Sequence, residues 1–536
     1  MYLKIDEQGF VIRKEDLPCE PLKDMLRNTY VTQNVSMAEV QRGGYLFCAP
    51  YFCIEGNVMK YVALPANYRG NVYVHQSKGC IVFSDDFFAL CKAVRKVHFQ
   101  FEHKQHLIHS ASLPLGKTWV SEIECLIGHK VYYLEQGRLV SQDILIMDLG
   151  KKDDENELYG TFKENLNKVV SEYGGGKHAL LLSGGADSRL LALVMDRQGL
   201  DFECYTAVMK PYYVSGVEDA EEAARVSRLI GKKNNLVDVD PKAFDIADID
   251  EIIEKMPYAV HVSLPFIGLM SQVQKDGKNK VWAGQNADTL YNLGPSGRVT
   301  KNFTGFMNLY KRFCITEEFY RSFPEVSGYS GLRRKVNYAV AGLGCRQYNR
   351  MKKTGMKMPD TLEELVNNYL HSYDYTIFSE DGAEREVLLE QREYEPHEIK
   401  KIIYNYKVRN FLKSGAPVVI DTVSSLFGIE DYILPFSSEL MLPVLQDVRL
   451  TTKNMFRPKK FIYRYIKEFE KDFGSGISKF DRTSLKLCRR KYGDLTDVHG
   501  AYEAIMKDTK IGRAIWGGAT TKNLPGGRVC SSCRRL

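Results

Sequence analysis

A short glycine-containing segment of the chain could bind a phosphate group. It reads Ser183-Gly184-Gly185-Ala186-Asp187-Ser188, and it lies between a short apolar run and a helical pattern. Ser183 offers a hydroxyl, while Gly184 and Gly185 let backbone N–H groups approach an anion closely. The helix that follows directs the positive end of its dipole to the same place. Asp187 would repel phosphate unless Mg²⁺ lay between them, so the segment predicts a metal–triphosphate site.

The same residues also have a purely structural interpretation. A tight glycine turn, with Asp187 and Ser188 capping the next helix, would give the same letters, and short glycine motifs often match by chance. A second segment, Ala283-Gly284-Gln285-Asn286-Ala287-Asp288-Thr289-Leu290-Tyr291, also follows a predicted strand. An ordinary turn would also account for the carboxylate of this segment, Asp288.

The elements that would position these loops change in character along the chain. Up to about residue 150, aromatic and β-branched runs bounded by turn residues predict a mostly β domain, with strands near residues 43–48, 61–64, 71–74, 80–83 and 130–134. After the polar stretch 150–157, strands at 179–182, 202–209, 236–239 and 280–283 alternate with helices at 158–173, 187–197 and 218–230. This alternation predicts βαβ units and a parallel sheet. From about residue 300 to 515 the helical period dominates.

Length and composition exclude several classes of protein. The chain has 536 residues, which is enough for two to four domains, and a net charge of +7 that forms no concentrated basic stripe. Its start carries early acidic residues and no long apolar core, so no secretory or mitochondrial leader is expected, and no apolar run reaches the length of a membrane span. The 12 cysteines are scattered except for Cys530 and Cys533. We therefore expect a reduced, cytoplasmic protein.

The two loops together resemble the asparagine synthase family of PP-loop ATP pyrophosphatases. That family has S-G-G-x-D-S after an apolar strand, then an acidic-led helix, here residues 219–231, and later a loop of the form S-G-E-G-A-D-E-L-F. The resemblance implies ATP and Mg²⁺ as cofactors, with Asp187 and Asp288 holding the metal on the pyrophosphate. The nucleotide-binding residues that it implies around them are Leu182, Ser183, Gly184, Gly185, Ser188, Val208 and Gly284.

Further segments continue the resemblance. Residues 431–440 are similar to the family's V-P-F-L-D-x-x-L, and residues 460–464 to its K-x-x-L-R, so Lys460 and Arg464 would face the triphosphate. A solvated helix face is the alternative interpretation of these basic side chains. The family's active-site lysine follows an arginine as R-x-K; here Arg482 fits, and the lysine is displaced to Lys486 or missing.

The second loop departs from the family pattern at the substrate side. Gln285 replaces the glutamate that lies by the substrate carboxylate and the incoming amine, and Asn286 replaces a glycine. A neutral amide in place of a charged acceptor should change which substrate binds or how its proton is handled. Gln285 is therefore, with Lys486 and Arg482, a candidate catalytic residue.

The N-terminal part resembles the family's glutaminase domain. Residues 80–90 and 116–129 are similar to its S-E-x-x-A-L and I-x-x-L-x-P-G-H segments. In that domain the cysteine after Met1 is the nucleophile and its own amine is the base. Tyr2 stands there in this chain, and the glutamine-holding loop Y-N-G-E-I-Y-N is absent. Cys19, Cys48 or Cys53 could act instead, but none of them carries a free amine. We expect a degenerate domain, with ammonia taken from solution or a separate donor, or an amine on the substrate.

The sequence thus predicts an α/β protein in three parts. These are a degenerate N-terminal nucleophile-type αββα sandwich over residues 1–150, a PP-loop parallel-sheet domain with a helical C-terminal part over 156–515, and a flexible tail over 516–536. The resemblance implies a ligase that activates a small-molecule or peptide carboxylate as an acyl-adenylate, releases pyrophosphate, and forms an amide with ammonia or an amine. No membrane or nucleic-acid partner is expected.

Two alternative functions remain open at this point. An inactive scaffold or regulatory protein would explain the lost nucleophile and the altered second loop, although it would not need to keep the metal pair. A PP-loop RNA-thiolating enzyme would use Cys530 and Cys533 for sulfur or metal, but one C-x-x-C supplies only two ligands. RNA modification also calls for a clustered basic surface, and Arg534 and Arg535 are the only local cluster.

Overall fold

The computed structural model describes selected parts of the chain. These are residues 2–6, 51–55, 58–64, 72–94, 97–98, 116–118, 120–126, 130–143, 155–173, 175–210, 212–240, 264–291, 427–429, 431–438, 440–441, 444–445, 459–479 and 485–495. The strand expected at 43–48, most of the helical region after residue 300 and the tail expected at 516–536 lie outside them. Among the described helices, none is both long and apolar enough to cross a membrane.

The described N-terminal residues form two four-stranded antiparallel sheets. One has the order β1 (Tyr2–Asp6), β5 (Cys80–Ser84), β4 (Tyr73–Ser77) and β6 (Glu124–Cys125); the other has β2 (Tyr51–Glu55), β3 (Val58–Leu64), β7 (Lys130–Glu135) and β8 (Arg138–Asp143). The β7–β8 hairpin turns through Gln136 and Gly137 with φ of 50° and 75°. Two such positive φ values give a turn whose twist matches the strands.

The two antiparallel sheets share one apolar core. Phe52 and Val62 from one sheet pack with Val74 and Phe83 from the other. Helix α2 (Phe87–Ala93), capped by Asp86, covers the outer face of the first sheet. The described residues thus include one helical layer and both β layers. The fourth layer of the predicted αββα sandwich lies outside the described residues and stays a prediction.

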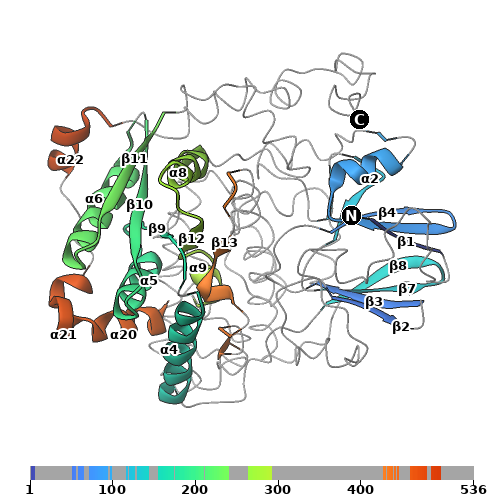
Figure 1. Cartoon of the computed structure of the whole chain (residues 1–536), viewed down its shortest axis with the longest axis horizontal. Coiled ribbons are helices and arrows are strands. Elements are labelled where there is room, and N and C mark those ends of the chain that lie inside the picture. The colour runs from blue at the N-terminus through green and yellow to red at the C-terminus, as the bar shows by residue number, and fades with distance from the viewer. Residues whose placement is uncertain are drawn as a thin grey trace, which may run out of the picture.

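The second part of the chain contains a five-stranded sheet that is parallel throughout. Its order is β11 (Asn234–Val239), β10 (Phe202–Met209), β9 (His178–Leu181), β12 (Lys280–Ala283) and β13 (Asp431–Ile433). Four of these strands were predicted, and the α/β class is confirmed; β13 was not expected, because three residues give little pattern. In Figure 1 this sheet and the antiparallel sheets lie at opposite ends of the molecule.

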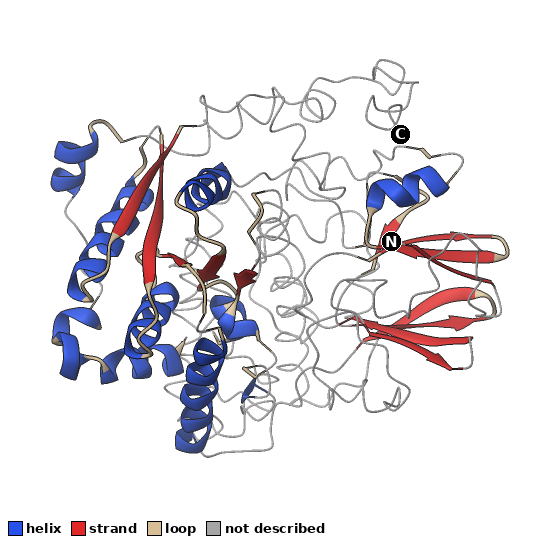
Figure 2. Ribbon diagram, in the orientation of Figure 1, coloured by secondary structure: helices blue, strands red, loops and turns tan. Residues whose placement is uncertain are grey.

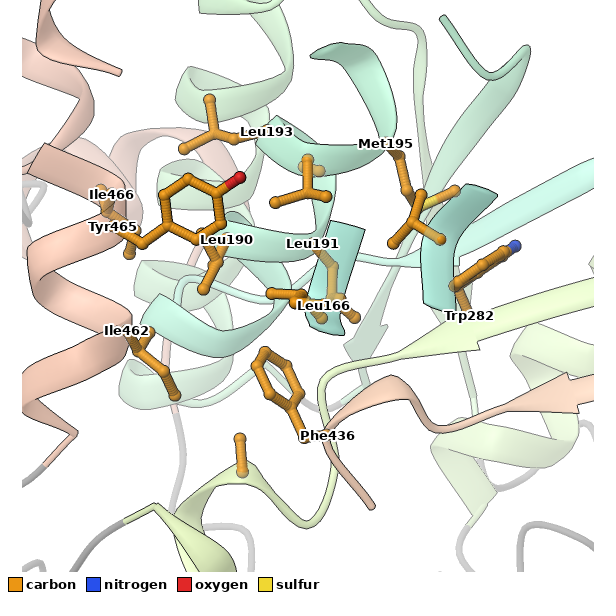
Figure 3. Packing of buried hydrophobic residues seen from close by; sticks show 14 of the residues in the cluster. Leu166, Leu190, Leu191, Leu193, Met195, Trp282, Phe436, Ile462, Tyr465 and Ile466 are labelled. Atoms are coloured by element: carbon orange, nitrogen blue, oxygen red, sulfur yellow. The ribbon is translucent and has the colours of Figure 1, made fainter. Parts of the chain in front are cut away.

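Helices cover both faces of the parallel sheet (Figure 2). Helices α4 (Glu155–Glu172), α5 (Ala186–Arg197), α6 (Val214–Leu229) and α20 (Lys460–Glu468) share one core, and α8 (Leu264–Lys275) packs in the other. Figure 3 shows Leu190 and Leu191 of α5 in the first core, facing Ile462 and Ile466 of α20. Burial of these apolar stripes provides most of the drive for the helices to dock.

Trp282 of β12 lies at the centre of this packing. Its side chain is fully buried, and its indole N–H donates to Nδ1 of His178 on the neighbouring strand at 3.0 Å. The ring of Tyr173 meets it edge-on, with 5.6 Å between ring centroids. The polar N–H is therefore satisfied inside an apolar layer, as buried tryptophan requires.

Three short elements follow α20 in the chain. They are α21 (Glu470–Phe473), the 3₁₀ turn η5 (Ser475–Ile477) and α22 (Leu485–Tyr492). Helix α22 packs on α6, where Cys488 lies with Val217 and Ala220. The segment through η5 therefore runs between the helix that follows the phosphate loop and the helix that follows β10.

Candidate functional site

The two loops meet at the carboxyl edge of the parallel sheet. The phosphate loop, residues 182–188, follows β9, and the second loop, residues 284–291, follows β12 (Figure 1). These strands are neighbours, and the chain leaves β9 in the direction away from β12, through α5 to β10. Such a reversal of strand order is a topological switch point, the place where open α/β sheets bind ligands.

The phosphate loop holds its own shape. Ser183 N donates to Oγ of Ser188 at 3.1 Å, and Gly185 N donates to Oγ of Ser183 at 3.2 Å. Gly185 is the N-cap of α5 and is exposed, as is Ser183, whereas Asp187 and Ser188 are buried. Ser188 therefore ties the loop together rather than capping the helix. The exposed glycine at the start of a helix offers backbone N–H groups to an anion.

Gly284 brings the second loop against the first. A Cβ built at Gly284 would lie 2.7 Å from Ser188 N and 2.9 Å from the carbonyl carbon of Asp187. Real Cβ atoms do not approach backbone this closely, so only glycine fits here. Gly284 thus belongs to the site through contact between the loops.

Asp187 is paired with a lysine that the sequence analysis missed. Lys459 Nζ lies 2.6 Å from Asp187 Oδ2, and each side chain is 13% exposed. Lys459 directly precedes α20 with a left-handed φ of 54°. A lysine in this backbone conformation has no sequence signal; the adjacent Lys460 was chosen because it fits the K-x-x-L-R pattern.

Lys460 and Arg464 contact α4 instead. Lys460 Nζ lies 3.1 Å from Glu155, and Arg464 donates to Asn156 at 3.1 Å while its guanidinium covers the ring of Tyr159 at 3.9 Å. Helix α20 turns these side chains toward α4 and turns Lys459 toward α5. Of Lys459, Lys460 and Arg464, the basic side chain that reaches the phosphate loop is therefore Lys459.

The other predicted residues lie in varied places. Leu182 and Val208 are buried in two apolar clusters to which α6 contributes, so only their backbones are available to a nucleotide. Lys486 is exposed on α22. Arg482, Cys530 and Cys533 lie outside the described residues. Asp288 falls within α9 (Ala287–Leu290), but its side chain is outside the description.

The second loop is supported by β13 and the turn that follows it. Gln285 Oε1 accepts from the hydroxyl of buried Tyr432 at 2.8 Å. Asn286 has a left-handed φ of 67°, and its Nδ2 donates to Oγ of Ser437 at 3.0 Å. Tyr432 and Ser437 thus hold the loop that carries Gln285. Because Tyr432 binds the oxygen of this amide, its NH₂ group is the part that can donate to a ligand.

Among the described side chains, Asp187 is the one predicted Mg²⁺ ligand whose position can be examined. In the described ranges, no group of three or more His, Cys, Asp or Glu side chains could enclose a metal ion. Asp187 nevertheless supplies a hard carboxylate beside the phosphate loop. Mg²⁺ suits such a site, since it keeps several waters and takes one or two carboxylates together with substrate phosphates.

Comparisons with known proteins bear on this site. Residues 174–306 match the family model for asparagine synthase, a range that includes both loops but ends before α20. No curated protein matches the chain. Among solved structures, NMN synthetase from Francisella tularensis shares 18% identity with a TM-score of 0.20, over 26% of this chain and 58% of its own length. The match thus spans little more than half of that protein.

A second solved structure is the U34-tRNA thiolase NcsA from Methanococcus maripaludis with its [4Fe-4S] cluster. It shares 11% identity with a TM-score of 0.19, over 47% of this chain and 80% of its own. Both TM-scores are too low to establish a common overall fold. The family model is the informative match, and members of that family are ATP-dependent ligases. The resemblance is confirmed over residues 174–306, which match the asparagine synthase family model.

Proposed function

We propose that the protein is an ATP-dependent ligase that activates a carboxylate as an acyl-adenylate and forms an amide. The observation that supports this most is the junction of the two loops. An exposed glycine loop at the start of α5, with Asp187 in the first helical turn, abuts the second loop through Gly284. The backbone N–H groups and the carboxylate suit a magnesium–triphosphate, and Gln285 adjoins the same junction.

The proposed reaction has two steps. An oxygen of the substrate carboxylate attacks the α-phosphorus of ATP, the bond to the bridging oxygen breaks, and pyrophosphate leaves with the electron pair. An amine nitrogen then attacks the acyl carbon, loses a proton, and displaces AMP. Mg²⁺, held by Asp187 and Asp288, would neutralise charge on the phosphates. The loop N–H groups would orient the leaving pyrophosphate, and Lys459 lies close enough to Asp187 to add positive charge.

The nitrogen source in this proposal is ammonia or an amine rather than glutamine. Tyr2 opens β1, and a phenol cannot replace a thiolate nucleophile. Of the alternative cysteines, Cys53 is 3% exposed within β2, while Cys19 and Cys48 lie outside the described residues. A buried thiol is shielded from substrate, which argues against Cys53.

The test is ATP–pyrophosphate exchange screened over carboxylic acids and peptides at millimolar Mg·ATP. Asp187→Asn should lower exchange by about 100-fold or more, because it removes a charged metal ligand beside the leaving group. Asp196→Asn is the matched control, since Asp196 lies at the far end of the same helix and pairs with Lys232. Thermal stabilisation by Mg·ATP is measured in parallel. If the protein binds no nucleotide, the ligase proposal is wrong and a scaffold role is favoured.

A further inference from the structure

A charged triad, buried at Arg189 and Glu222 and partly buried at Arg225, joins the phosphate loop to the segment after α21. Arg189 of α5 is 3% exposed, and its Nη2 lies 2.6 Å from Oε1 of Glu222 on α6, which is 1% exposed. Arg225 binds the same carboxylate, through Nη2 to Oε1 at 2.6 Å and Nε to Oε2 at 2.9 Å. Two guanidinium groups thus share one carboxylate. Burying them is costly, and apolar residues of similar size often stabilise such places at least as well.

The remaining donors of the two arginines are directed to main-chain carbonyls. Arg189 Nη1 donates to the carbonyls of Ile477 and Lys479 at 3.1 and 3.2 Å. Arg225 donates to the carbonyls of Gly476 and Lys479, both at 2.8 Å. The Lys479 carbonyl therefore receives charged hydrogen bonds from two helices, although its residue is exposed.

The same guanidinium also binds the phosphate loop. Arg189 Nη2 donates to the carbonyl of Gly184 at 3.2 Å. Gly184 and Lys479 are consequently bound to the two terminal nitrogens of one planar group. The rigid fork of arginine fixes the distance between them, which a lysine's single flexible ammonium does not do.

We propose that Arg189, Glu222 and Arg225 are positioning residues that hold residues 476–479 against the phosphate loop, so that the ammonium of Lys479 serves the bound phosphates. This inference rests on the proposed ligase function for the role of Lys479. The anchoring of the segment stands on the hydrogen bonds alone. With its backbone fixed beside Gly184, the flexible four-carbon stem of Lys479 gives its charge access to the anion site and offsets charge on the leaving pyrophosphate.

The experiment compares the full-length protein with Arg189→Lys, Arg225→Lys, Lys479→Met and the double variant Arg189→Lys/Lys479→Met. Arg228→Lys is the control, because Arg228 is exposed one turn further along α6. We expect Arg189→Lys and Lys479→Met to lower kcat of pyrophosphate exchange by about 30- to 100-fold with KM for ATP changed less than about threefold. The double variant should lose no more than the stronger single variant. If the fold-losses in kcat of the two single variants multiply in the double variant, or if Lys479→Met loses no kcat, the proposal is overturned.

Two readouts are independent of turnover. Hydrogen exchange of the amides of residues 477–479 without nucleotide should become at least about tenfold faster in Arg189→Lys than in Arg228→Lys. Unchanged exchange would overturn the anchoring. Lys479 should be protected from amine acylation by Mg·ATP, whereas Lys486 on α22 should not. Should Arg189→Lys fail to fold, Arg225→Lys gives the same comparison, since Arg225 is only partly buried. If hydrogen exchange of residues 477–479 is faster in Arg189→Lys but the protein binds no nucleotide, the ligase function is refuted and the anchoring of the segment stands.

Discussion

At the scale of single residues, the site depends on close approaches that only certain side chains permit. Gly284 lies against the backbone of Asp187 and Ser188. Lys459, at the start of α20, forms an ion pair with the Asp187 carboxylate. Gly185 and Ser183 remain exposed at the top of the loop. The close approach at Gly284 therefore fixes how the two loops meet, and the Lys459–Asp187 ion pair sets the charge beside the phosphate loop.

Gly284→Ala should destabilise the protein and weaken nucleotide binding. The added Cβ meets backbone atoms, which cannot move aside as a side-chain end can, so we expect a loss of about 2–4 kcal/mol in the free energy of unfolding. Urea denaturation with and without Mg·ATP measures both effects. Gly160→Ala on the exposed side of α4, where a Cβ meets nothing within 4 Å, should instead stabilise by up to about 1 kcal/mol. Equal behaviour of the two variants would refute the contact.

Lys459→Met should lower the free energy of unfolding more than Lys460→Met does. The first leaves a mostly buried carboxylate without its ammonium, for which we expect about 2–4 kcal/mol in guanidinium denaturation. The second removes a pair whose Glu155 is 41% exposed, which is worth under about 1 kcal/mol. A larger effect at Lys460 would place the important cation at the residue that the sequence pattern favoured.

Sequence reasoning found the parts of the site that local patterns encode. Ser183, Gly184 and Gly185 have a fixed spacing after a strand, so their placement was predictable. Lys459 was missed because its contact depends on a left-handed backbone and on docking of α20 against α5. Arg189 was missed as well, since an arginine in a helical pattern normally indicates a solvated face, whereas this one is buried with Glu222.

At the scale of elements, strand order brings distant segments together. The pattern of alternation predicted β9 to β12, but their order, with β9 between β10 and β12, is a tertiary fact that no local period encodes. Helix α6 begins at Val214, four residues before the predicted start. The sequence did not predict this first turn because valine, serine and glycine are weak helix formers. Strand β13 and the turn after it owe their position to contact with β12.

The strands of the parallel sheet also carry an acid-sensitive contact. Hydrogen bonds from Lys278, Asn235 and Lys233 lower the pKa of Glu203 on β10 to about 2. A carboxylate whose pKa is depressed by folding stabilises the protein above its unfolded pKa, near 4.5, and the stabilisation is lost as the pH falls toward 2. We expect Glu203→Gln to lose about 1–2 kcal/mol at pH 7 and to show a flatter stability profile between pH 5 and 2. Chemical denaturation across that range measures it, and parallel profiles for both proteins would refute it.

At the scale of the whole molecule, the two sheet systems have different chemical content. The parallel sheet carries both loops at its switch point. Among the described residues of the N-terminal part, Cys53 on β2 and Cys91 on α2 are buried, at 3% and 7% exposed, while Cys80 and Cys125 are partly buried. The two buried thiols are shielded from substrate, in line with the proposed use of ammonia or an amine.

The nitrogen source tests this division. Once a carboxylate substrate is found, AMP formation should proceed with ammonium or an amine at least about tenfold faster than with glutamine, because no accessible N-terminal thiolate is expected to release ammonia. Coupled assay of AMP, with ammonium as the positive control, measures it. Glutamine-driven turnover that is abolished by a thiol-alkylating reagent would show that a cysteine does act as nucleophile.

The buried indole of Trp282 gives the protein an optical reporter close in the chain to the second loop. Its N–H donates to Nδ1 of His178, so that nitrogen carries no proton and the imidazole is held as the tautomer protonated on Nε2. The chain has three tryptophans. Trp282 directly precedes Ala283, the last residue of β12, after which the second loop begins. Its emission should lie at short wavelength in the folded protein. Ligand-induced movement of the second loop should then change its intensity, which makes fluorescence titration a direct measure of occupancy.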